Sequence, residues 1–177
     1  PGRPIPGDAE LVILPGSKST ISDLEKLRIN GWDIDLKAHH RRGGKILGIC
    51  GGYQMLGTEI HDPEGIEGLP SSVAGLGYLD ITTKMTSKKN LSLVTAHTLK
   101  TGIALNGYEI HIGVTSGPDC DQGWLEIDGR KEGAVSKNGQ VRGCYLHGLF
   151  ASDGFRTEYL KSLGIQSGLA NYDASIN

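Results

Sequence analysis

A cysteine enclosed by glycines is the strongest chemical signal in the sequence. Cys50 lies in the segment GICGG (residues 48–52), directly after an apolar run. This G-x-C-x-G pattern is the cysteine counterpart of the G-x-S-x-G nucleophile elbow. A nucleophile raised on a sharp turn brings backbone segments together, so the flanking positions need residues without a Cβ. The pattern predicts a nucleophilic thiol that a helix N-terminus favours as thiolate. The alternative is a small buried hydrophobe in an ordinary turn.

Backbone groups near the elbow are candidates for stabilising an oxyanion. The N–H of Gly51, directly after the nucleophile, is where the first donor belongs in such an elbow. The segment PGSKST (residues 15–20) follows another apolar run, and we expect the backbone of Gly16 and Ser17 to provide the second donor. This segment superficially suggests a phosphate loop. It lacks the G-x-x-x-x-G-K-[ST] spacing, so we predict no nucleotide site there.

A cysteine hydrolase also needs a histidine that takes the thiol proton and returns it to the leaving amine. Of the six histidines, His147 is the best candidate because it ends a strand-like run and is followed by Gly148. His111 is the runner-up, and it could equally face a substrate or fill a core position. The histidines show no H-x-x-x-H or other metal-ligand spacing, so we predict no metal site.

Strands and helices joined by tight turns must position these groups. The high glycine content and short alternating segments favour an α/β fold. The apolar runs 11–14 and 45–49 predict buried strands. A helix is expected from Thr20, with Asp23 completing a capping-box-like start, and a second helix from about Asp33.

The second half of the chain is expected to be rich in strands. Residues 76–114 alternate with a period of two, and Asp-Gly at 128–129 and Asn-Gly at 138–139 predict two hairpins. A last strand over 141–146 would deliver His147 to the carboxyl end of an open sheet, where ligands bind in α/β folds. A terminal helix closed by Gly164 is predicted to follow.

Composition limits the functional classes. The net charge of −2 disfavours nucleic acid as a partner, and the apolar runs are too short to span a bilayer. Three widely spaced cysteines form no disulfide framework or metal knuckle, which favours a reducing, cytoplasmic location. We expect one domain over 1–177, with 1–10 as a linker or truncated start of a longer polypeptide and 165–177 as a C-terminal tail.

Four motifs taken together resemble the C-terminal glutamine amidotransferase domain of CobQ-type cobyric acid synthases. The motifs are ILPGSK (13–18), GICGGYQMLG (48–57), GYEIHIG (107–113) and YLHGLF (145–150). The resemblance implies a flavodoxin-like, class I glutamine amidotransferase fold. Its open mixed sheet would be largely parallel and flanked by helices, with a β-rich second half.

The resemblance also implies a reaction. Cys50 would attack the side-chain amide of glutamine, form a glutamyl thioester and release ammonia. A separate synthetase domain, absent from this chain, would use the ammonia with ATP and Mg²⁺ to amidate adenosylcobyrinic acid a,c-diamide in cobalamin biosynthesis. The expected partners are therefore glutamine, that synthetase domain and its corrinoid substrate, and no cofactor is expected in this chain.

Several residues near Cys50 and His147 become candidates for oxyanion stabilisation or substrate binding. They are Gly16, Ser17, Gly51, Gly52, Tyr53, Gln54, Glu109 and His111. Ordinary class I amidotransferases place a glutamate two residues after the histidine, but Leu149 stands there, as in the subgroup that uses a Cys-His pair. Glu109 is a candidate to orient His147. Val114 occupies a position where the family pattern has arginine.

Two alternatives remain open. A related amidotransferase, such as the one that amidates lipid II glutamate in cell-wall synthesis, would share this half of the chemistry, because the acceptor is not encoded in these motifs. A catalytically silent binding or regulatory module could retain the fold and act through a partner.

Overall fold

A small parallel sheet forms the centre of the molecule, which is a computed structural model that describes residues 2–165. Strands β1 (Leu11–Leu14), β2 (Lys45–Ile49) and β10 (Val141–Cys144) run parallel, and β9 (Ala134–Val135) pairs antiparallel with β10. The first two strands have the predicted bounds. The predicted C-terminal tail, apart from Ile165, lies outside the described residues.

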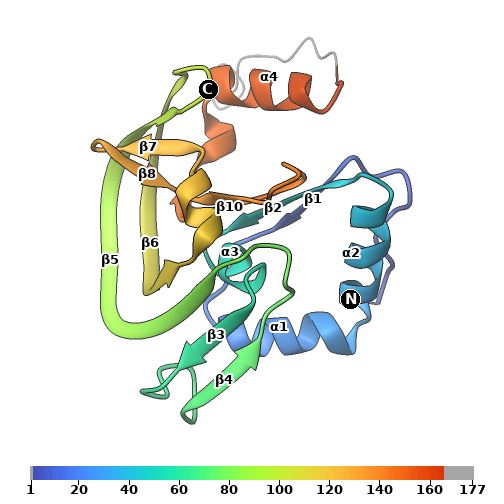
Figure 1. The fold of residues 1–177 in the computed structure, drawn as a ribbon, viewed down its shortest axis with the longest axis vertical. Helices are drawn as coiled ribbons and strands as arrows, with labels where there is room; N and C mark the ends of the chain where they lie inside the picture. Colours follow the sequence, from blue (N-terminus) through green and yellow to red (C-terminus); the bar gives the residue numbers. More distant parts are fainter. Residues whose placement is uncertain (1, 166–177) are drawn as a thin grey trace, which may run out of the picture.

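Helices cover both faces of this sheet. α1 (Thr20–Ile29) and α2 (Trp32–Arg41) lie on one side, whereas α4 (Asp153–Ser162) lies at the other end of the molecule (Figure 1). Successive residues of β2 pack into different hydrophobic clusters. Ile46 packs with side chains of α1 and α2, and Leu47 packs with those of α4. Burial on both faces explains why β2 reads as a continuous apolar run, whereas β1 is only partly buried and exposes Ile13.

The start of α1 corrects one prediction. Thr20 and Asp23 do not form a capping box, because the N-cap residue is Ser19 and no side chain of the first turn caps the helix. The carboxylate of Glu67 instead accepts hydrogen bonds from the N–H groups of Thr20 and Ile21, both at 2.8 Å. A remote negative charge thus satisfies the helix N-terminus and favours its macrodipole.

A second, largely antiparallel sheet occupies the other side of the molecule, as the alternating pattern predicted. Its long strands β5 (Thr82–Thr98) and β6 (Ala104–Ser116) curve together along this side (Figure 1). Strand β11 (Leu146–His147) pairs with the outer edge of β6, while β3 (Glu59–Asp62) and β4 (Ser71–Ala74) extend the sheet beyond β5.

Both predicted hairpins are confirmed. β7 (Leu125–Ile127) and β8 (Arg130–Glu132) are joined by Asp128 and Gly129, whose φ angles of 50° and 76° suit the tight turn. The Asn-Gly dipeptide at 138–139 lies in the loop between β9 and β10.

The last predicted strand is in fact two strands in different sheets. β10 ends at Cys144, and the chain crosses at Tyr145 to enter the second sheet as β11. The N–H of Tyr145 donates to the buried carboxylate of Glu132 at 2.8 Å. His147 therefore belongs to an antiparallel pair with β6 and does not end a parallel strand. The α/β class with helices flanking a mixed sheet is confirmed.

Candidate active site

The elbow of Cys50 has the geometry that its glycines predicted. Cys50 adopts φ 53° and ψ −112° between β2 and the short helix α3 (Gly51–Met55). A Cβ placed on Gly52 would lie 2.0 Å from the carbonyl oxygen of Leu14, and one on Gly48 would lie 2.7 Å from the carbonyl oxygen of Gly52. No side chain fits at either position, which confirms the steric reason for the motif.

The environment of the thiol corrects the expectation of a prepared thiolate. Cys50 is only 8% exposed, and its Sγ donates to the carbonyl oxygen of Ile110 at 3.2 Å. Burial raises the pKa of the Cys50 thiol, although the neighbouring N–H of Gly51 acts in the opposite direction. Since α3 has five residues, its N-terminus does not outweigh desolvation of the charged form. The resting group is a thiol.

Gly16 brings the candidate base to the candidate nucleophile. It lies in the loop after β1, where a Cβ would be 3.1 Å from Cε1 of His147 and 3.7 Å from Cβ of Cys50. The two side chains also share the backbone of Ile110, whose carbonyl accepts from the Cys50 thiol and which acts to raise the pKa of the His147 ring. Residues that are almost 100 positions apart in sequence thus meet around one glycine.

The His147 ring is held as a neutral base. Burial lowers the pKa of the His147 imidazole, and the backbone of Ile110 opposes this shift only in part. Its Nε2 atom is buried and lacks a hydrogen-bond partner among the described residues. One face of the ring is stacked on Tyr108, its partner across β6 and β11. An unpartnered ring nitrogen next to a thiol is equipped to receive a proton.

The predicted oxyanion donors lie next to each other. The backbone nitrogen of Ser17 is 2.9 Å from where a Cβ of Gly51 would be, so the loop after β1 packs against the start of α3. The hydroxyl of Ser17 is already engaged, donating to Asp23 at 2.6 Å. The predicted oxyanion donors are therefore the backbone N–H groups of the Gly16–Ser17 loop and of Gly51. The N–H of Gly52 already donates to the carbonyl of Pro15.

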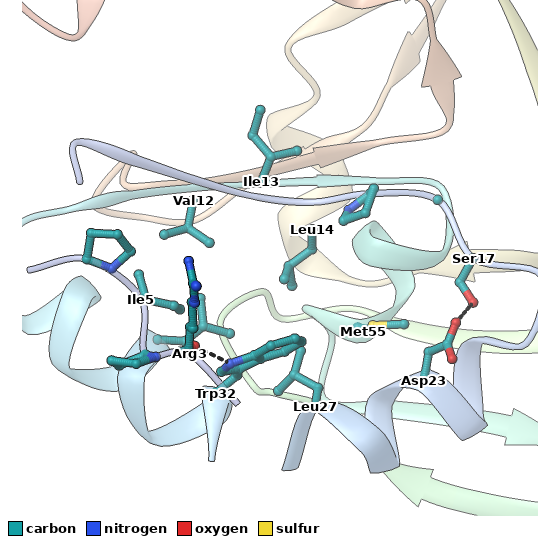
Figure 2. A pocket seen from close by; sticks show the side chains of 15 residues that line it. Arg3, Ile5, Val12, Ile13, Leu14, Ser17, Asp23, Leu27, Trp32 and Met55 are labelled. Atoms are coloured by element: carbon teal, nitrogen blue, oxygen red, sulfur yellow. Dashed lines mark hydrogen bonds between the residues drawn. The ribbon is translucent and has the colours of Figure 1, made fainter. Parts of the chain in front are cut away.

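An apolar cavity of about 400 Å³ opens on the other side of β1. Val12 and Leu14 point into it towards Trp32 and Leu27, whereas Ile13 points away (Figure 2). Its wall includes Gly16 but neither Cys50 nor His147. The cavity thus adjoins the oxyanion loop without containing the reacting groups.

Tyr53 and Gln54 support the elbow from beneath. Each is 2% exposed, and the Gln54 amide accepts from Thr20 and donates to the Ile112 carbonyl and to the Tyr145 hydroxyl. The two tyrosine rings, Tyr53 and Tyr145, meet edge to face with centroids 5.2 Å apart. Tyr53 and Gln54, both predicted to bind substrate or stabilise the oxyanion, therefore contact other protein groups in this structure.

Glu109 and His111 line a separate polar cavity of about 530 Å³. Glu109 accepts a hydrogen bond from Arg130 at 2.5 Å, and Arg130 also binds Glu132 at 2.8 Å. His111 stacks on Tyr145 with centroids 3.7 Å apart, and burial lowers the pKa of its imidazole. Glu109 stands opposite Leu146 in the ladder, one position away from the pair that contains His147, so it points to the other face.

Sequence reasoning missed four contributors to this region. Tyr108 and Ile110 lie within a recognised motif, but only the tertiary structure reveals that Tyr108 stacks on His147 and that the Ile110 carbonyl accepts from the Cys50 thiol. Arg130 and Glu132 come from the β7–β8 hairpin and carry no local signal. Only the structure shows that half-exposed Arg130 pairs with the buried carboxylates of Glu109 and Glu132.

Residues 2–165 hold neither a candidate metal site nor a candidate membrane span. They contain no group of three or more His, Cys, Asp or Glu side chains that could hold a metal ion. None of their helices is both long and apolar enough to cross a membrane.

Known proteins resemble this chain in sequence. A family model described as a CobB/CobQ-like glutamine amidotransferase domain matches residues 1–155. The chain is 60% identical over 176 residues to the cobyric acid synthase of Ruegeria sp. (strain TM1040) and 57% identical to that of Cereibacter sphaeroides (strain ATCC 17023). The aligned region covers 99% of this chain in both cases, but only 36% and 37% of the two relatives.

Solved structures support the fold. A glutamine amidotransferase crystal structure superimposes with a TM-score of 0.61 at 18% identity, covering 88% of this chain and 80% of that one. PurLQS from Thermotoga maritima gives a TM-score of 0.57 at 20% identity, with coverages of 89% and 78%. At these identities the likeness concerns the fold.

Proposed function

The chain belongs to the CobB/CobQ-like family of glutamine amidotransferase domains, and from this premise we propose that it hydrolyses glutamine through Cys50 and His147. The observation that carries the proposal is the meeting of the two side chains around Gly16, with the buried Nε2 of His147 unpartnered among the described residues. A buried thiol and a neutral imidazole form a nucleophile and its base.

The first half of the reaction forms a thioester. His147 takes the proton of the Cys50 thiol as Sγ leaves the Ile110 carbonyl and attacks the side-chain amide carbon of glutamine. The oxyanion that forms accepts hydrogen bonds from Gly51 N–H and from the loop after β1, and each such donor is worth roughly 3 kcal/mol in the transition state. His147 then gives its proton to the leaving nitrogen, the C–N bond breaks and ammonia departs.

The second half regenerates the enzyme. Water attacks the glutamyl thioester while His147 removes a water proton, and the C–S bond breaks to release glutamate and the thiol. The same ring thus serves twice as base and acid. Its lowered pKa suits this exchange, because the imidazole is neutral when each half-reaction begins.

The ammonia acceptor is assigned from the relatives. Since these are cobyric acid synthases, we propose that the ammonia amidates peripheral carboxylates of adenosylcobyrinic acid a,c-diamide in the cytoplasm. The chain spans little more than a third of their length, so we place the corrinoid, ATP and Mg²⁺ on a synthetase part outside these residues. No step above passes through ATP or a metal.

A glutamine-analogue diazoketone tests the proposal on the longest polypeptide that contains this chain. Peptide mass mapping should find a single adduct on Cys50, and Cys50→Ser should lower glutamine hydrolysis by about a thousandfold or more. Cys120→Ser is the matched control, because Cys120 is a half-buried thiol at the far side of Tyr53. Labelling of Cys120, or equal loss of activity in both variants, would contradict the assignment.

A further inference from the structure

We infer that Tyr108 is a positioning residue for His147, and that its stacked ring fixes the imidazole in place of the carboxylate of a Cys-His-Glu triad. The inference deepens the proposed function and rests on it. A general base needs a third group that fixes its ring, because an imidazole rotates freely about its Cβ–Cγ bond unless packing or a hydrogen bond prevents it.

The carboxylates nearest in the motifs are not placed for this task. Leu149, where a triad glutamate is expected, is buried among apolar side chains. Glu109 stands opposite Leu146 and is bound by Arg130. Glu132 is shared between Arg130 and the N–H of Tyr145.

Tyr108 lies where it can hold the His147 ring in place of a carboxylate. It is the direct cross-strand partner of His147 in the β6–β11 ladder, so both side chains project from the same face. The two ring centroids are 4.8 Å apart and the planes differ by 5°. A parallel stack of this kind restricts rotation of the imidazole.

Other backbone contacts complete the enclosure of the ring. The Gly16 backbone approaches Cε1 so closely that an added Cβ would be 3.1 Å away. The Ile110 backbone also acts on the ring, since it opposes the lowering of the imidazole pKa. A π face beside the ring also favours the imidazolium that forms when His147 accepts the thiol proton.

Tyr108 is poorly explained as a core residue. Its side chain remains 41% exposed, and Leu93, which stands opposite it in β5, is 89% exposed. Replacing either with alanine removes surface apolar area at the same level of the ladder. Leu93→Ala is therefore the matched control for Tyr108→Ala.

The test compares Tyr108→Ala, Tyr108→Phe and Leu93→Ala in the longest polypeptide that contains this chain. Tyr108→Ala should lower kcat for glutamine hydrolysis by about 10- to 100-fold, as misplacement of a catalytic group does, with KM within about twofold. Tyr108→Phe keeps the stack and should retain kcat within about twofold, like Leu93→Ala. Equal kcat in the two alanine variants would overturn the inference, as would a rise in KM at unchanged kcat.

A second measurement does not depend on turnover. Ring resonances of His147, assigned with His147→Gln, should show one ring orientation in the wild type and in Tyr108→Phe but averaging between orientations in Tyr108→Ala. Unchanged ring signals in Tyr108→Ala would also overturn the inference. If the wild type shows these signals but hydrolyses no glutamine, the proposed function fails while the stacking role is still decided by the spectra.

Discussion

At the residue scale, Cys50 and His147 form a neutral pair. Burial raises the pKa of the thiol and lowers the pKa of the imidazole, so both shifts oppose a resting thiolate–imidazolium pair. The Cys50 thiol donates its proton to a hydrogen bond with the Ile110 carbonyl, with Sγ 3.2 Å from the oxygen. The thiolate is the reactive form of cysteine, so a thiol that is ionised only during attack is protected from side reactions such as oxidation.

The neutral pair predicts a pH profile. Because its pKa is lowered, the His147 imidazole is still neutral at pH values just below the ordinary histidine pKa of 6.5. It becomes protonated only as the pH falls through the lowered pKa. The acid limb of kcat/KM for glutamine hydrolysis should therefore have its midpoint below 6.5, measured between about pH 4.5 and 9. A midpoint above 6.5 would instead indicate an imidazolium stabilised by a charged partner.

At the element scale, the elbow depends on how closely β1 approaches α3. Gly52 N–H donates to the Pro15 carbonyl, and its Cα lies directly against the Leu14 backbone. This approach brings the loop after β1 beside Cys50, where its predicted oxyanion donors can act. The glycines of the motif thus serve the contact between two elements as much as the turn itself.

Gly52→Ala should therefore be far more harmful than an ordinary glycine substitution. Its Cβ would lie 2.0 Å from the Leu14 oxygen, so we expect a loss of about 4 kcal/mol or more in the free energy of unfolding, or failure to fold. Gly139→Ala is the control, since it meets no atom within 4 Å and strains only a φ of 71°. Its cost should be roughly 1–2 kcal/mol by urea denaturation, and equal costs would refute the close-contact argument.

At the scale of the whole molecule, two sheets meet at Tyr145. Cys50 belongs to the end of the parallel sheet and His147 to the antiparallel one, so the pair exists only because the chain crosses between sheets. Glu132 holds this crossing by accepting from Tyr145 N–H and Arg130. Glu132 is only 7% exposed, and this burial raises the pKa of its carboxyl.

Removing the acceptor at this junction should destabilise the fold. Glu132→Ala leaves the buried Tyr145 N–H without its partner and should cost about 1–3 kcal/mol, whereas Glu132→Gln keeps an oxygen acceptor and should cost less. Glu126→Ala, at an exposed position of the neighbouring strand, should stay within about 0.5 kcal/mol. Chemical denaturation monitored by tryptophan fluorescence measures all three, and a Gln variant as damaged as the Ala variant would contradict this role.

Local patterns determined much of this protein. The apolar runs at 11–14 and 45–49, the two hairpin dipeptides and the glycines around Cys50 are continuous patterns of residue types, so the strands, turns and elbow could be predicted from the sequence. The resemblance of four motifs likewise indicated the family that the comparisons show. The roles of Cys50 and His147 stay predictions that the geometry supports.

Only the tertiary structure decided the features that join distant residues. Glu67 caps α1 from 46 and 47 positions away, the strand expected over 141–146 divides between two sheets, and Tyr108 meets His147 across a ladder. The direction of the Cys50 pKa shift also depends on the tertiary structure. Burial raises this pKa and outweighs the opposite effect of the Gly51 N–H at the start of α3. Spacing along the chain carries no information on such contacts, because they depend on which strands pair and how deeply each group is buried.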